Sequence, residues 1–195
     1  MMKRTLITAA IALASAGAFA QTNAATTTQR DVNQQTRIEN GLKDGSLTTR
    51  EAAKLEKEEG RVDHMQAKAL KDGKLSDAER AKLNAAQNKV SADIKAERHD
   101  AQTGNPNSAS SKRMQADVQR NINQEKRIQA GVQNGSLTNR EAGKLEAGQA
   151  RVDRKEAIAG RDGHVNSLEQ ASVQRSENRQ SKRIHRQKHD AQTRG

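Results

Sequence analysis

Apolar residues recur about every seven positions along much of the chain. Leu55, Val62 and Ala69 form one such series, and Leu83 and Val90 begin another. This spacing is typical of helices that bury a narrow apolar seam rather than a wide face. The residues between are mostly Ala, Glu, Lys, Gln and Arg, which favour helix. The pattern predicts three helices in the first half of the chain, at 29–43, 48–71 and 76–100. Three equivalent helices are predicted 90 residues later.

The two halves of the chain align without a gap at an offset of 90 residues. Of the 75 positions from 29 to 103, 34 are identical to their equivalents. Between the repeats, "TGNPNSASSK" contains the only proline and has the composition of a linker. Because short turns join antiparallel helices, we expect an all-α fold of two tandem three-helix, up-down-up units joined by a polar linker. The first repeat is 21–103, the linker 104–112, and the second repeat 113–195, which ends in a basic helix.

Residues 1–20 have the three parts of a secretory signal. Lys3 and Arg4 are followed by an apolar run and then by the small-x-small sequence Ala18-Phe19-Ala20. The apolar run is short for a membrane span, although an uncleaved anchor is the alternative. We therefore expect a periplasmic or secreted protein that begins at Gln21 and has no integral membrane segment after cleavage.

Aromatic residues and cysteine are absent from the expected mature chain, since Phe19 is the only aromatic residue and there is no Cys. Aromatic rings supply much of the buried area in most cores, and no disulfide can compensate for their loss. Helix propensity, helix caps and thin apolar seams must therefore stabilise this fold.

The phrase "LKDGSLTTREAAKLE" at 42–56 recurs in altered form at 70–84, 132–146 and 160–174. In each version a glycine that can end a helix precedes a Thr, Ser or Asn that can cap the next one. A Glu three residues after the cap completes a capping box, and the apolar residue before it suits a hydrophobic staple. The phrase thus predicts four helix–helix joints, with glycines 45, 73, 135 and 163 and caps Thr48, Ser76, Thr138 and Asn166.

The same phrase also resembles the second half of an EF-hand calcium loop. Asp44 and Glu51 in the first version, and Asp72 and Glu79 in the second, match the later ligand positions. The earlier ligand positions hold residues such as Leu42, which cannot ligate calcium. We favour the capping function and keep these four carboxylates as candidate calcium ligands.

Histidines suggest a second candidate metal site. His185 and His189 are four residues apart, so on a helix they share a face and could both reach one transition-metal ion. A solvated polar face is the alternative, because two ligands make half a site and Arg186 and Lys188 lie beside them. Neither site requires a bound metal, and no cofactor is expected.

Positive charge is concentrated in the second half of the chain. Residues 29–103 hold 15 Lys/Arg and 14 Asp/Glu, whereas residues 112–195 hold 18 and 10. Five basic residues near the C-terminus fall on one helical stripe, a candidate polyanion-binding site that comprises Arg175, Arg179, Lys182, Arg183 and Arg186. A merely solvated charged face is the alternative. Without aromatic rings to stack on bases, sequence-specific nucleic-acid binding is not expected.

No arrangement of residues indicates catalysis. The chain has no Cys nucleophile, no G-x-S-x-G turn, no phosphate-binding glycine loop and no HExxH. We expect each carboxylate to have a Lys or Arg nearby at helical spacing and to form a solvated ion pair with it. An enzyme is therefore not expected.

The repeated "DGxLTxxE" units, together with the "HDAQT" ends, resemble small exported helical proteins of Gram-negative bacteria. This resemblance implies a periplasmic or secreted location but brings no established activity. Three functions follow as hypotheses: a structural, interaction or envelope-stress protein with a protein or anionic envelope partner; a divalent-cation-binding protein; and an electrostatic binder of lipopolysaccharide or nucleic acid.

Overall fold

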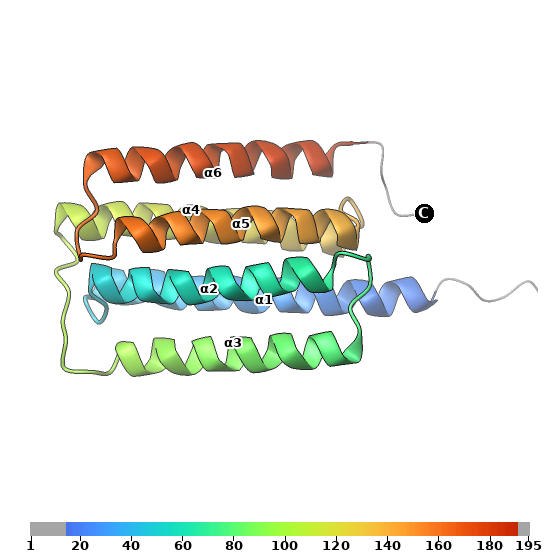
Figure 1. Ribbon diagram of the computed structural model, residues 1–195, viewed down its shortest axis with the longest axis horizontal. Coiled ribbons are helices and arrows are strands. Elements are labelled where there is room, and N and C mark those ends of the chain that lie inside the picture. Colours follow the sequence, from blue (N-terminus) through green and yellow to red (C-terminus); the bar gives the residue numbers. More distant parts are fainter. Residues whose placement is uncertain (1–14, 191–195) are drawn as a thin grey trace, which may run out of the picture.

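The computed structural model describes residues 15–190, with side chains from residue 24 onward. This part of the chain is all-α, as predicted, and contains six helices and no strand (Figure 1). Residues 1–14 of the expected signal lie outside the described range, and the expected cleavage site falls within the first helix. The helices are α1 (Ser15–Asp44), α2 (Thr49–Ala69), α3 (Asp77–Glu97), α4 (Ala109–Gln133), α5 (Asn139–Ala159) and α6 (Ser167–Lys188).

The two repeats share one core. The most extensive helix contacts join equivalent helices of different repeats, α1 with α4 and α2 with α5. Both pairs are antiparallel, so the repeats are related by an approximate two-fold axis (Figure 1). The third helices, α3 and α6, lie on opposite outer sides of this central group of four helices, α6 beyond α4 and α5 and α3 beyond α1 and α2 (Figure 1). Each of the two apolar clusters at the ends of the bundle draws side chains from both repeats.

The four predicted joints are confirmed. Their glycines have φ between 79° and 89°, the left-handed conformation that suits glycine. Every cap residue accepts the backbone N–H of the Glu three residues later, and that Glu accepts the N–H of the cap residue in return. The preceding apolar residues are all buried. The phrase therefore ends one helix and starts the next, and the residues concerned are Leu47, Leu75, Leu137 and Val165.

The connection between the repeats begins and ends earlier than the predicted linker, because α3 ends at Glu97, Ser108 caps α4 and residues 109–112 are helical. The remaining segment packs against the first joint, where the Gly104 N–H donates to the Gly45 carbonyl at 2.9 Å. A Cβ atom on Gly104 would lie 2.3 Å from the Leu47 carbonyl oxygen. This close approach holds the connection between the repeats against the bundle.

Small residues allow α2 and α5 to approach closely. A Cβ atom on Gly60 would lie 3.1 Å from the Asp153 Cβ and 3.3 Å from the Ala150 carbonyl oxygen. Toward one end of the pair, a Cβ on Gly143 would lie 2.9 Å from the Leu70 Cβ. When two helix backbones lie this close, they gain dispersion contacts without large side chains. These contacts stabilise a core that has no aromatic residue.

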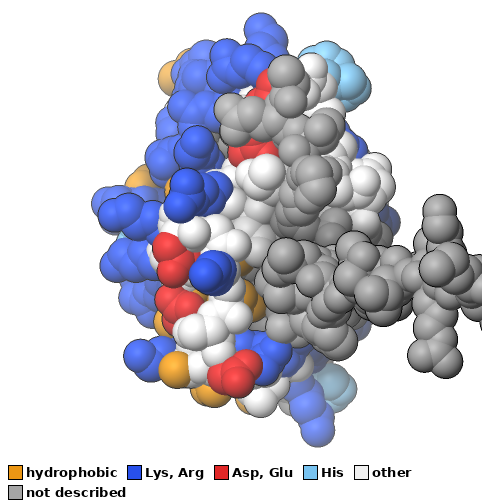
Figure 2. All heavy atoms as spheres, turned by 90° about the vertical axis from the view of Figure 1, so that its right-hand side faces the viewer, with side chains coloured by type: hydrophobic (Ala, Val, Ile, Leu, Met, Phe, Trp, Pro, Cys, Tyr) orange, Lys and Arg blue, Asp and Glu red, His pale blue; other side chains and the backbone are white. Residues whose placement is uncertain are grey.

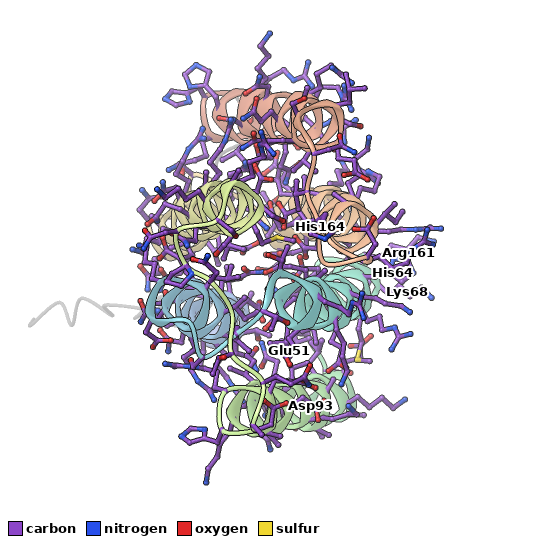
Figure 3. All side chains as sticks on the ribbon, turned by 90° about the vertical axis from the view of Figure 1, so that its left-hand side faces the viewer. Glu51, His64, Lys68, Asp93, Arg161 and His164 are labelled. Carbon is purple, nitrogen blue, oxygen red and sulfur yellow. The ribbon has the colours of Figure 1, made fainter. Side chains whose placement is uncertain are left out.

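Charge is strongly segregated between the interior and the surface. Thirteen of the 24 acidic side chains are buried, whereas no Lys or Arg side chain in the described range is. The expectation that the carboxylates form solvated ion pairs is therefore wrong for about half of them. Lys and Arg crowd one long side of the molecule in an end view (Figure 2). In the opposite end view, His64, Lys68 and Arg161 point outward on the side of α2 and α5 (Figure 3).

Candidate functional site

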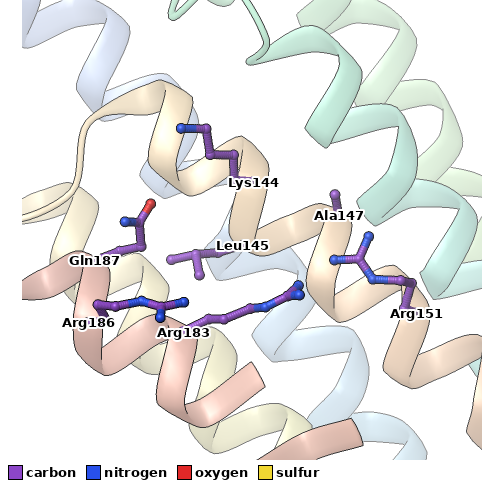
Figure 4. Close-up of a pocket in the computed structure, with 7 residues that line it drawn as sticks. All are labelled: Lys144, Leu145, Ala147, Arg151, Arg183, Arg186 and Gln187. Atoms are coloured by element: carbon purple, nitrogen blue, oxygen red, sulfur yellow. The ribbon is translucent and has the colours of Figure 1, made fainter. Parts of the chain in front are cut away.

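A groove between α5 and α6 is lined mainly by basic side chains (Figure 4). It has a volume of about 400 Å³ and includes Lys144, Arg151, Arg183 and Arg186. A second groove continues from it toward the start of α6, and a third follows the seam between α2 and α5. Arg151 lines all three. We call the Lys and Arg residues of these grooves the basic face: Lys57, Arg61, Lys144, Arg151, Arg154, Lys155, Arg179, Arg183 and Arg186.

The basic face includes three of the five predicted stripe residues. Arg179, Arg183 and Arg186 line the grooves, whereas Arg175 and Lys182 are exposed elsewhere on α6. The six contributions from α2 and α5 were missed, because the sequence gives no direct sign that α5 lies beside both α2 and α6. Basic residues of α5 and α6 thus face one another across the grooves, whereas the sequence predicted a basic stripe on the C-terminal helix alone.

Positive charge on the basic face is not balanced locally. No acidic side chain lines any of the three grooves in the described part of the chain. Partial burial and the nearby charge of Arg183 lower the pKa of Arg151. A cation whose pKa is lowered by a second cation nearby favours the binding of an anion beside it.

The candidate calcium ligands of the joints have other partners. Asp44 accepts the Ser46 N–H at 2.9 Å and forms an ion pair with Arg98 at 2.7 Å. Asp72 accepts the Lys74 N–H, while Glu51 and Glu79 close their capping boxes. Glu51 also lies near Glu97 and Asp100, with one oxygen of each within 4.8 Å of the others. Local backbone hydrogen bonds thus account for the conformation of the EF-hand-like residues.

The two candidate histidines are stacked on the surface of α6. The ring centroids of His185 and His189 are 4.3 Å apart, and the His189 Nδ1 lies 2.7 Å from the His185 carbonyl oxygen. That contact directs one ring nitrogen of His189 to the backbone. Within the described range, no third His, Asp or Glu joins them in a group with metal-binding spacing.

Buried carboxylates form two clusters at the centre of the bundle, which the sequence did not predict. Glu56, Asp153 and Glu156 form cluster A, and Asp63, Glu125 and Glu146 form cluster B. In each cluster, one carboxylate oxygen of every member lies within 4.8 Å of the others. No member is more than 2% exposed. Helices α2, α4 and α5 supply them.

Burial dominates the electrostatics of this interior. It raises the pKa of Glu56 and of Asp31 to about 7. Burial, followed by the charge of Glu146, raises the pKa of Glu125 well above its ordinary value. Burial and then the charge of Asp117 raise the pKa of Glu177 to about 8. Removal from water and mutual repulsion both oppose ionisation, so the interior favours a bound proton or cation.

The chain matches no protein-family model, no curated protein and no solved structure in the comparisons made with it. Within residues 15–190, none of the helices has the length and apolar character needed to span a bilayer. Functional inference therefore depends on the basic face and the buried carboxylates themselves.

Proposed function

We propose that the chain is an exported, non-catalytic interaction protein that binds phosphate-bearing polyanions through the basic face. The observation that supports this proposal is a set of adjoining grooves lined by Lys and Arg from three helices, with no acidic residue among them. Arginine guanidinium groups bind phosphate oxygens in a bidentate geometry. Arg151 and Arg183, from facing helices, could contact one phosphate group between them.

Recognition by this surface would depend on charge alone. The basic face has no aromatic side chain to stack on a base, so binding should be independent of sequence and strongly weakened by salt. A periplasmic or secreted location would make phosphorylated envelope glycolipids, such as lipopolysaccharide, the natural partner. An anionic envelope component therefore fits the proposal better than cellular nucleic acid.

The test compares two triple variants that remove equal charge from equivalent outer helices. Arg179→Gln, Arg183→Gln and Arg186→Gln remove three charges from the basic face. Binding to lipopolysaccharide and to an oligothymidylate, which provides a regular series of phosphates, would be measured from 50 to 300 mM salt, roughly the range over which counterion release is resolved. The matched control is the triple variant on and beside α3 that comprises Lys74→Gln, Lys82→Gln and Lys95→Gln.

We expect the basic-face variant to lose most of its affinity for both ligands. The slope of log K against log salt for the oligothymidylate should fall in magnitude by about 2, because each phosphate contact contributes about 0.7. The control should keep nearly all of the affinity. Equal losses in the two variants would show that net charge, and not the basic face, governs binding, and would contradict the proposal.

A further inference from the structure

The two carboxylate clusters occupy equivalent positions in the two repeats. Glu56 of cluster A and Glu146 of cluster B are 90 residues apart, as are Asp153 and Asp63. These four residues lie on the closely packed pair α2 and α5, near the centre of each helix. The approximate two-fold axis of the bundle therefore relates one cluster to the other.

Asn121 donates to Glu156 at 2.7 Å and to Asp153 at 3.3 Å in cluster A. Each cluster also has one glutamine that donates to it, and with this glutamine the two clusters become quartets of the same composition. Gln35 donates to the Glu56 carboxylate at 2.9 Å in cluster A, and Gln66 donates to the Glu146 carboxylate at 3.1 Å in cluster B. Gln35 is the repeat equivalent of Glu125, and Gln66 is the repeat equivalent of Glu156. Glutamine and glutamate have thus exchanged places between the repeats, and each quartet still has three carboxylates and one amide.

Several oxygens of these quartets have no hydrogen-bond donor. Within the described residues, no amide, hydroxyl or backbone N–H donates to either oxygen of Glu125, to the amide oxygen of Gln35 or to that of Gln66. The same is true of one oxygen on each of four further members. A buried polar oxygen without a partner is costly, and no buried Lys or Arg compensates for it. The four are Glu56 Oε1, Asp153 Oδ2, Glu156 Oε1 and Glu146 Oε2.

The ligands available are exclusively oxygens. Carboxylate and amide oxygens suit hard cations such as Ca²⁺, Mg²⁺ and Mn²⁺, whereas thiolate and imidazole, which select softer metals, are not among the buried side chains. We propose that each quartet binds one hard divalent cation, so that the folded chain holds two. Apolar clusters at both ends of the bundle cover these sites, and the cations would therefore bind as the helices associate.

The test measures metal stoichiometry after refolding. The protein is refolded from urea in Ca²⁺ or Mn²⁺, exchanged into metal-free buffer, and weighed by native mass spectrometry. Glu156→Gln removes a carboxylate from cluster A, and Glu125→Gln removes one from cluster B. Both substitutions preserve side-chain size, and both relieve buried charge, so the variants should fold. Matched controls are Glu141→Gln and Glu169→Gln, which alter capping boxes.

We expect two equivalents of cation in the wild type, one in each single variant and none in the double variant, with two retained in both controls. Thermal unfolding provides a second measurement that does not depend on retention. Ca²⁺ at a hundred times its Kd should raise the Tm of the wild type, with two sites occupied, by about 10–20 °C, and should leave the Tm of the double variant unchanged. The proposal is overturned if the wild type retains no cation and shows no shift in Tm, or if the double variant binds as the wild type does.

Discussion

Two equivalent grooves in this molecule have opposite electrostatic character. In the first repeat, the groove between α2 and α3 is closed by ion pairs: Lys54 with Glu97, and Lys89 with both Asp93 and Glu58. In the second repeat, the groove between α5 and α6 keeps the bases at the equivalents of Lys54 and Lys89, which are Lys144 and Arg179. The acidic partners of these bases in the first repeat, however, have no acidic equivalents in the second repeat.

Three substitutions account for the difference. The equivalents of Glu58, Asp93 and Glu97 are Gly148, Arg183 and Gln187, respectively. In the first repeat, the hydrogen bond from Lys89 lowers the pKa of Asp93, because a cationic donor stabilises the ionised form of a carboxyl group. In the second repeat, the same backbone presents unpaired cations. The same helix pair thus forms a closed ion-pair network in one repeat and a binding surface in the other.

The largest expected effect comes from giving the second groove the acids of the first. Arg183→Asp together with Gln187→Glu changes the local charge by three and allows Arg179 to form the i,i+4 pair that Lys89 forms with Asp93. Affinity for lipopolysaccharide at low salt should fall about a hundredfold. The reciprocal pair, Asp93→Arg with Glu97→Gln, should increase binding. Fluorescence titration checks both, and no change in either variant would remove the functional contrast between the grooves.

The next effect concerns the seam that brings the repeats together. Gly60 and Ala150 are equivalent residues on α2 and α5, and a Cβ added to Gly60 would lie only 3.1 Å from the Asp153 Cβ. Gly60→Val should therefore cost about 2–3 kcal/mol of unfolding free energy through overpacking. Ala150→Gly, which creates no clash, should cost only about 1 kcal/mol through helix propensity. Urea unfolding monitored by circular dichroism measures both, and equal costs would show that the seam is not tightly packed.

A third comparison concerns an interior acid. Gln87 on α3 is equivalent to Glu177 on α6, whose pKa is raised to about 8. A carboxyl group with a raised pKa binds its proton more tightly in the folded state, so its contribution to stability is lost as the pH rises from about 4.5 to about 8. In metal-free buffer the protein should thus be less stable at pH 8 than at pH 5.

Glu177→Gln, which restores the residue of the first repeat, should flatten this pH dependence. We expect a gain of about 2 kcal/mol at pH 8 and little change at pH 5. Arg120, whose Nε lies 3.1 Å from Glu177, loses its ion pair in this variant, which limits the gain. Urea unfolding at the two pH values, with chelator present, provides the measurement. An equal gain or loss at both would assign the effect to packing instead of ionisation.

The joints could be predicted from sequence because they depend on local residues. A glycine, a cap residue such as Thr48 and the Glu three positions later form their contacts within one turn. Helix pairing was not predictable in the same way, since duplicated helices can pack within a repeat or between repeats. The buried acids were missed for a related reason: Glu56 has Lys54, Lys57 and Arg61 nearby in the sequence, and only packing against α1 and α5 removes it from water.

The smallest effects should come from the joints themselves, and they compare three of the four copies of one local structure. Thr48→Ala removes a hydroxyl that accepts the Glu51 N–H at 3.2 Å, and Ser76→Ala removes one that accepts the Glu79 N–H at 3.3 Å. Each should cost about 1 kcal/mol. The conservative change Asn166→Ser keeps a capping oxygen and should lower the free energy of unfolding by only about a few tenths of 1 kcal/mol. Differences in urea midpoint at constant m-value measure these costs. A cost above about 3 kcal/mol for Thr48→Ala would exceed what a cap contributes, and would imply that the joint near Gly104 also holds the two repeats together.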